Sequence, residues 1–175
     1  TTDMEVLKAA YNTLAAHPDF IRFRRDIPIV GIWDDHDFGW NDVGRDYPMK
    51  NESKEIFLDF FKEPKDSERR KREGIYTSYF YGEAPERVQV IMLDMRWFRS
   101  DLKYSEAGEY IPNPDPAATL LGDEQWLWLE EQLQVPADLR ILASPSQLVA
   151  SQHAWEKWAN FPLEKARLFG LIDRL

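Results

Sequence analysis

A dense cluster of carboxylates, one amide and one imidazole directly follows an apolar run early in the chain. The cluster consists of Asp34, Asp35, His36, Asp37, Asn41 and Asp42. Carboxylates this close repel one another, so their pKa values rise unless a cation lies among them. Oxygen and imidazole ligands suit hard or borderline metal ions. The cluster therefore predicts a metal site; the alternative is an Asx-rich turn whose side chains cap its own backbone.

Two further apolar runs also end in residues that are capable of chemistry. Residues 88–93 are followed by Asp94, Met95 and Arg96, and residues 139–143 by the polar segment 144–147. In an open α/β sheet, ligands bind beyond the carboxyl ends of the strands. If the strands run parallel, the three clusters share one rim that holds carboxylates, an imidazole for proton transfer and a guanidinium for an oxyanion. The alternatives are a surface ion pair of Asp94 with Arg96 and ordinary loop residues at 144–147.

The elements that must position these clusters follow from hydrophobic periodicity. We expect strands at 27–33, 76–81, 88–93 and 139–143, the second and third as a hairpin. We expect helices at 3–16, 51–62, from 122 onward and 162–175, and short helical segments near 19–25 and 155–160. The final helix should turn Leu168, Leu171, Ile172 and Leu175 inward. Strands that alternate with helices predict a layered α/β domain.

Three other features have ordinary structural interpretations. The run 65–73 mixes both charge signs and predicts a solvated helical face, with a phosphate-binding patch as the alternative. Residues 99–120 form a long predicted loop, and loops of that length are often functional. His17 precedes a proline and is expected to cap a helix, and His153 is expected at the surface.

Composition limits the possible functions. The chain has 175 residues, of which 43% are hydrophobic and 14% aromatic, enough for one domain or a large part of one. Its net charge of −9 argues against a nucleic-acid partner. If the substrate is an anion, bound cations would be needed to offset the negative charge of the protein. The absence of cysteine excludes disulfides and thiolate metal sites, and no apolar run is long enough to span a membrane.

Four segments resemble, in the same order, the alkaline phosphatase D-like metallophosphatases of the calcineurin-like metallophosphoesterase superfamily. They are residues 33–42, 90–96, 121–129 and 155–162, and the resemblance covers the chain from about residue 20 onward. It implies an α/β fold with a layered β-sheet sandwich flanked by helices. It also implies a metal-dependent phosphatase or phosphodiesterase with a small-molecule phosphoester substrate, secreted or periplasmic. The oligomeric state is left open.

The resemblance also implies roles for individual residues. In that superfamily a Gly-Asn-His-Asp/Glu block supplies a metal ligand and a catalytic histidine, and residues 34–37 stand in its place. Asp35 would then bind metal, His36 would stabilise or protonate the leaving alkoxide, and Arg96 would contact phosphate. Asp34 and Asn41 are further candidate metal ligands. The expected cofactor is two metal ions, with iron, calcium, zinc or manganese as the candidates.

The remaining metal motifs of that superfamily are an early Asp, a Gly-Asp-Asn block and a Gly-Asp-x-His block, and this sequence contains none of them. We therefore expect residues 1–175 to form a partial metallophosphatase-like catalytic domain that lacks the N-terminal and C-terminal metal-ligand motifs. Two other functions stay open. One is a catalytically empty scaffold or binding module with the same fold, and the other is a glycosidase, which needs two carboxyl groups about 5 to 10 Å apart across a cleft.

Overall fold

The structure is a computed structural model, and it describes residues 1–174. Its main sheet has the order β1-β2-β5, formed by β1 (Thr77–Tyr81), β2 (Val88–Met92) and β5 (Leu139–Ala143). β1 and β2 are antiparallel and form the predicted hairpin, whereas β2 and β5 are parallel. The carboxyl ends of β2 and β5 therefore lie at the same edge. A small ribbon of β3 (Lys103–Tyr104) and β4 (Tyr110–Ile111) interrupts the predicted loop at 99–120.

Helices make up most of the remaining regular structure. They are α1 (Met4–Ala16), α2 (Pro18–Asp26), α3 (Asp35–Phe38), α4 (Lys50–Phe60), α5 (Glu68–Lys71), α6 (Gly122–Gln134), the 3-10 helix η1 (Trp158–Asn160) and α7 (Pro162–Ile172). The Asp3 carboxylate caps α1 by accepting from two backbone amides. His17 caps α2 as predicted, because its Nδ1 accepts from the Asp19 amide at 3.3 Å. None of the described helices is both long and apolar enough to cross a membrane.

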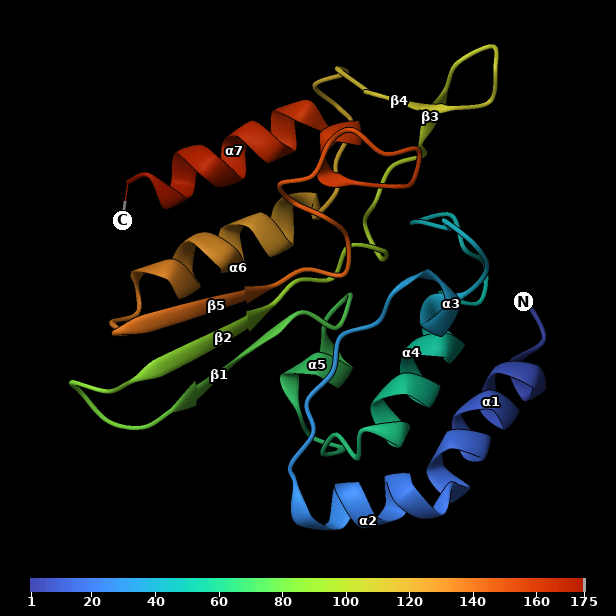
Figure 1. Ribbon diagram of the computed structural model, residues 1–175, viewed down its shortest axis with the longest axis vertical. Coiled ribbons are helices and arrows are strands. Elements are labelled where there is room, and N and C mark those ends of the chain that lie inside the picture. The colour runs from blue at the N-terminus through green and yellow to red at the C-terminus, as the bar shows by residue number, and fades with distance from the viewer. Residues whose placement is uncertain (175) are drawn as a thin grey trace.

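The helices fall into two groups around the sheet. Figure 1 shows α6 beside β5 and α7 beside α6, whereas α1, α3 and α4 lie beyond the carboxyl ends of β2 and β5. Each group has its own core. One core centres on α6, the helix predicted from residue 122 onward, whose Trp126, Leu129 and Leu133 are buried. The other core centres on Trp33 and Phe57. The described residues thus form a mixed α/β fold, as expected, with small sheets; a layered sandwich of sheets stays a prediction.

The predicted strand at 27–33 is wrong. The segment is extended, but no described strand pairs with it, and Ile27 and Val30 are exposed. An apolar run specifies which side chains favour burial, whereas a strand also needs a hydrogen-bonded partner. Only the end of the segment is fixed in a core: Trp33 is fully buried, and its Nε1 donates to Asp94 Oδ1 at 2.8 Å. The acidic cluster that follows this segment still lies near the carboxyl ends of β2 and β5.

The prediction of a solvated face at 65–73 is also wrong in part. Arg69 is buried, where its Nε donates to the Ile75 carbonyl at 2.8 Å and its Nη2 to the Gly31 carbonyl at 3.0 Å. Its Nη1 lies 3.1 Å from Glu63 Oε2. A run of mixed charges predicts solvation only when no carbonyls or opposite charges lie within reach. Here the Arg69 side chain holds the extended segment against the start of the sheet.

Smaller differences concern the C-terminal third. The helix predicted at 155–160 is the shorter η1, and α7 ends at Ile172, which is exposed rather than turned inward. The predicted inward position of Leu175 lies outside the described residues. His153, expected at the surface, is half-buried, and its Nδ1 accepts from the Trp155 amide at 3.2 Å.

Candidate functional site

A hollow of about 160 Å³ brings together residues from all three predicted polar clusters. It is lined by Asp34, Asp35, Asp42, Arg96, Pro145, Ser146, Gln147, Trp155 and Glu156. The last strand residues of β2 and β5, Met92 and Ala143, pair with each other, so the segments that follow both strands start side by side. The shared rim expected from the sequence is therefore present, although the first cluster reaches it from an extended segment.

Arg96 is at the centre of this rim and is almost completely buried, with 3% of its side chain exposed. Its Nη1 donates to Glu156 Oε2 at 2.6 Å, and its Nε donates to Asp34 Oδ1 at 3.1 Å. Burial alone would lower the pKa of Arg96, but the charges of Glu156 and Asp34 outweigh it and hold the pKa above its ordinary value. Arg96 is thus a buried cation that joins the segment of Asp34 to the segment of Glu156.

The proposed surface ion pair of Asp94 with Arg96 is wrong, because both residues are buried and they do not pair through their charges. Asp94 accepts hydrogen bonds from Trp33 Nε1 and from the backbone amides of Ile75, Arg96 and Trp97. All four donors lie within 3.1 Å of its carboxylate oxygens. Both carboxylate oxygens of Asp94 are occupied by these donors. Asp94 therefore stabilises the backbone below the rim, and it does not line the hollow.

The acidic turn is largely capped by its own residues, which is the alternative that the sequence left open. The Asp34 amide donates to Asp37 Oδ2 at 3.1 Å. The two oxygens of Asp35 accept from the amides of His36 at 2.9 Å and Asp42 at 3.0 Å. Partial burial raises the pKa of Asp35, but the Asp42 amide, the Arg96 charge and the His36 amide together bring it below its ordinary value. Asp34 is the exception, since its carboxylate faces Arg96.

His36 and Asn41 do not line this hollow. The His36 side chain is 77% exposed, and its Nε2 lies 3.9 Å from Asp35 Oδ2. Asn41 Nδ2 donates to Asp42 Oδ2 at 2.7 Å, and Asn41 lines a neighbouring hollow together with Trp40. The structure therefore brings Asp34, Asp35 and Arg96 together. It leaves His36 at the solvent-facing side of the same turn.

Sequence reasoning missed Glu156 and Arg99 as parts of the site, and it placed Asp42 in the acidic cluster without giving it a role. Glu156 is buried between two guanidiniums: Arg96, and Arg99, whose Nε lies 3.1 Å from Glu156 Oε1. Asp42 has a φ of 53°, a left-handed conformation that Asp tolerates better than most residues, and its carboxylate accepts from the Tyr110 hydroxyl. The only sequence signal for Glu156 was its place in the resembling segment 155–162. Its partners are distant in the sequence.

The described residues do not by themselves fit a two-metal centre. Residues 1–174 contain no group of three or more His, Asp or Glu side chains that could hold a metal ion. Three of the oxygens that would serve as ligands also accept hydrogen bonds within the chain, since Asp34 Oδ1 accepts from Arg96 and both Asp35 oxygens accept from backbone amides. Arg96 and the amide donors balance part of the charge of the cluster, but the charges of Asp34 and Asp35, together with burial, still raise the pKa of Asp37 above its ordinary value.

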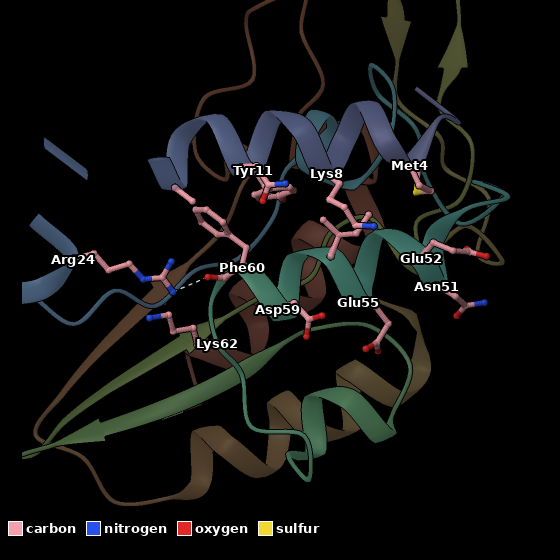
Figure 2. A pocket seen from close by; sticks show the side chains of 13 residues that line it. Met4, Lys8, Tyr11, Arg24, Asn51, Glu52, Glu55, Asp59, Phe60 and Lys62 are labelled. Carbon is pink, nitrogen blue, oxygen red and sulfur yellow. Dashed lines mark hydrogen bonds between the residues drawn. The ribbon is translucent and has the colours of Figure 1, made fainter. Parts of the chain in front are cut away.

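A larger hollow, of about 800 Å³, lies away from this rim between α1 and α4. Figure 2 shows Lys8 and Tyr11 on α1 facing α4, and Arg24 donating to the Phe60 carbonyl. The carboxylates of Glu55 and Asp59 along α4 are already paired with Arg70. None of the predicted site residues lines this hollow. Size alone does not make it the site, because it contains no polar side chains that converge on one point.

Comparisons with known proteins bear on the fold and the family. The family model described as PhoD-like phosphatase matches residues 2–172. None of the curated proteins matches the chain. A solved structure entitled "Structure of PhoD" superposes with a TM-score of 0.56 at 19% sequence identity, covering 82% of this chain and 31% of that chain. The chain therefore spans about a third of the length of that structure, and the superposition supports the fold alone.

Proposed function

This chain belongs to the PhoD-like phosphatase family, and we propose that its full-length protein is a metal-dependent hydrolase of small-molecule phosphoesters. The observation that carries the proposal is the convergence of Asp34, Asp35 and Arg96 on one hollow, although Asp34 and Arg96 are 62 residues apart. A guanidinium at a rim of carboxylates is suited to holding a phosphoryl group beside groups that handle protons or cations. The proposal covers phosphatase and phosphodiesterase activity.

The proposed roles concern this chain's own residues. His36 is exposed on the acidic turn, where its imidazole can give a proton to the leaving alkoxide. Arg96 stabilises negative charge on the phosphoryl oxygens. For this, its contact with Asp34 must loosen, because its other partner, Glu156, is buried whereas the Asp34 side chain is 48% exposed. Asp35, Asp34 and Asn41 remain proposed metal ligands, and the rest of the full-length protein would complete the centre.

A catalytically empty scaffold with the same fold is the second candidate. The observation that favours it is the internal pairing of rim side chains, where Arg96 is paired with Glu156 and Asp34, and Asp35 accepts from two amides. Metal analysis of the purified full-length protein separates the two candidates. About two ions per chain together with hydrolysis of a nitrophenyl phosphoester supports the enzyme, and no bound metal with no hydrolysis supports the scaffold.

The sharpest test of the proposal is His36→Ala in the full-length protein. Loss of a positioned proton donor should lower kcat by about 10²- to 10⁴-fold, and the exposed position of His36 predicts unchanged folding and metal content. Steady-state kinetics and metal analysis provide the measurement. His17→Ala is the matched control, since His17 is also exposed but caps α2. Full activity of the His36 variant would show that the assigned role is wrong.

A further inference from the structure

Trp155 is unusually exposed for a tryptophan that borders a polar hollow. It is 74% exposed, whereas Trp33, Trp97 and Trp126 are buried in the two cores. It lines the same hollow as Asp34 and Arg96. Residues 1–174 provide no aromatic or cation–π partner for its ring within the usual stacking range. Within the described residues, the indole is therefore available at the mouth of the hollow.

The backbone that carries this ring is held in place. The Trp155 amide donates to His153 Nδ1 at 3.2 Å, and its carbonyl accepts from Lys157 Nζ at 3.0 Å. The next residue, Glu156, is bound to Arg96 at 2.6 Å. Slightly further along, Trp158 is fully buried, and its Nε1 donates to Ser144 Oγ at 2.9 Å. A backbone tied from both sides loses little additional freedom when a ligand contacts the side chain that it carries.

We propose that Trp155 is a specificity-determining residue that makes the site prefer phosphoesters with an aromatic group. This inference rests on the proposed function, because it takes the hollow as the phosphoester site. Trp155 directly precedes Glu156, the residue that holds Arg96, so a phosphoryl group at Arg96 places its ester substituent near the indole. An aryl group gains face or edge contact with the indole that an alkyl group of similar charge lacks.

The test compares phenylphosphonate with methylphosphonate, which carry the same anionic head, as ligands of the full-length protein. Calorimetric titration should show tighter binding of phenylphosphonate. Trp155→Ala should weaken phenylphosphonate binding roughly three- to tenfold and leave methylphosphonate binding unchanged, and Trp155→Phe should restore most of the difference. The hydrolysis of aryl and alkyl phosphodiesters by each variant, taken as a ratio to the wild-type rate, should show the same selectivity.

Tyr81→Ala is the matched control. Tyr81 is also exposed and aromatic, but it pairs with Val88 at the opposite end of β2 from the rim. Equal loss for both phosphonates, or no loss for either, in Trp155→Ala would overturn the aromatic preference while leaving the phosphoester site intact. Failure of the wild-type protein to bind either phosphonate or to hydrolyse any phosphoester would overturn the proposed function itself.

Discussion

At the scale of single residues, the main feature is a chain of alternating charges at the rim. Asp34, Arg96, Glu156 and Arg99 follow one another in space, and the last three are buried. A buried guanidinium without a carboxylate partner is costly, because its charge has lost its hydration. Glu156 serves two guanidiniums at once, so the position of Arg96 depends on it more than on half-exposed Asp34.

We predict that Glu156→Gln destabilises the protein by about 3 kcal/mol. The variant keeps the volume of the side chain but leaves Arg96 and Arg99 facing each other without a negative charge between them. Urea unfolding gives the free energy. Glu130→Gln is the control: Glu130 pairs with Arg167 at 3.1 Å near the surface, so its loss should cost at most about 1 kcal/mol. Equal costs for both variants would contradict the importance of the buried pair.

At the scale of elements, the site depends on one pair of parallel strands and one extended segment. Parallel pairing of β2 with β5 places the residues that follow both strands at one edge. The segment 27–33 has no such pairing, so side chains must hold it. Arg69 of α5 does this at the Gly31 carbonyl, and Trp33 does it at Asp94. The acidic turn is thus positioned by two side-chain anchors.

We predict that Arg69→Met costs about 3 kcal/mol, because the Gly31 and Ile75 carbonyls and the Glu63 carboxylate all lose a charged donor. Limited proteolysis within residues 27–33 should accelerate in the same variant. Lys71→Met is the control on the same helix, since Lys71 only forms an exposed pair with Glu68 at 2.8 Å. If the rate of proteolysis within residues 27–33 is the same in both variants, Arg69 does not anchor the segment.

At the scale of the whole molecule, two hydrophobic cores meet at Asp94. Trp33 and Ile75 belong to one core, and Met95, adjacent to Asp94 in the chain, belongs to the other. Asp94 is fully buried and accepts from Trp33 Nε1 and the Ile75 amide. It therefore joins the first core to the carboxyl end of β2, which belongs to the second core. The rim is built directly on this junction, which makes the site sensitive to how the cores are joined.

We predict that Asp94→Asn destabilises the protein by about 2 to 3 kcal/mol, since one carboxylate oxygen becomes an amide nitrogen that cannot accept from its present donors. Near-ultraviolet circular dichroism should also change, because the new amide nitrogen faces either the Trp33 indole or the Ile75 amide, and both donors hold the first core against residue 94. Asp138→Asn is the control, as Asp138 is exposed and accepts only from the Arg87 amide at 2.9 Å. A near-ultraviolet spectrum of Asp94→Asn like that of the wild type would contradict a joining role.

The sequence by itself determined the features that depend on neighbouring residues. The β1–β2 hairpin, the buried face of α6 and the capping of α2 by His17 all follow from local periodicity and local hydrogen bonds. The convergence of the two polar clusters that follow β2 and β5 was also predictable, because parallel strands bring their carboxyl ends to one edge. The acidic turn reaches the same hollow from a segment that pairs with no described strand.

Only the tertiary structure decided which partner each charge has and whether the segment 27–33 pairs as a strand. Arg96 is bound to residues 62 and 60 positions away, and Arg69 is bound to a carbonyl 38 positions away. The free energy of a charged side chain depends on the donors, acceptors and water around it in space. Spacing along the chain does not specify those surroundings. For the same reason, an apolar run does not determine whether another strand lies beside it and pairs with it.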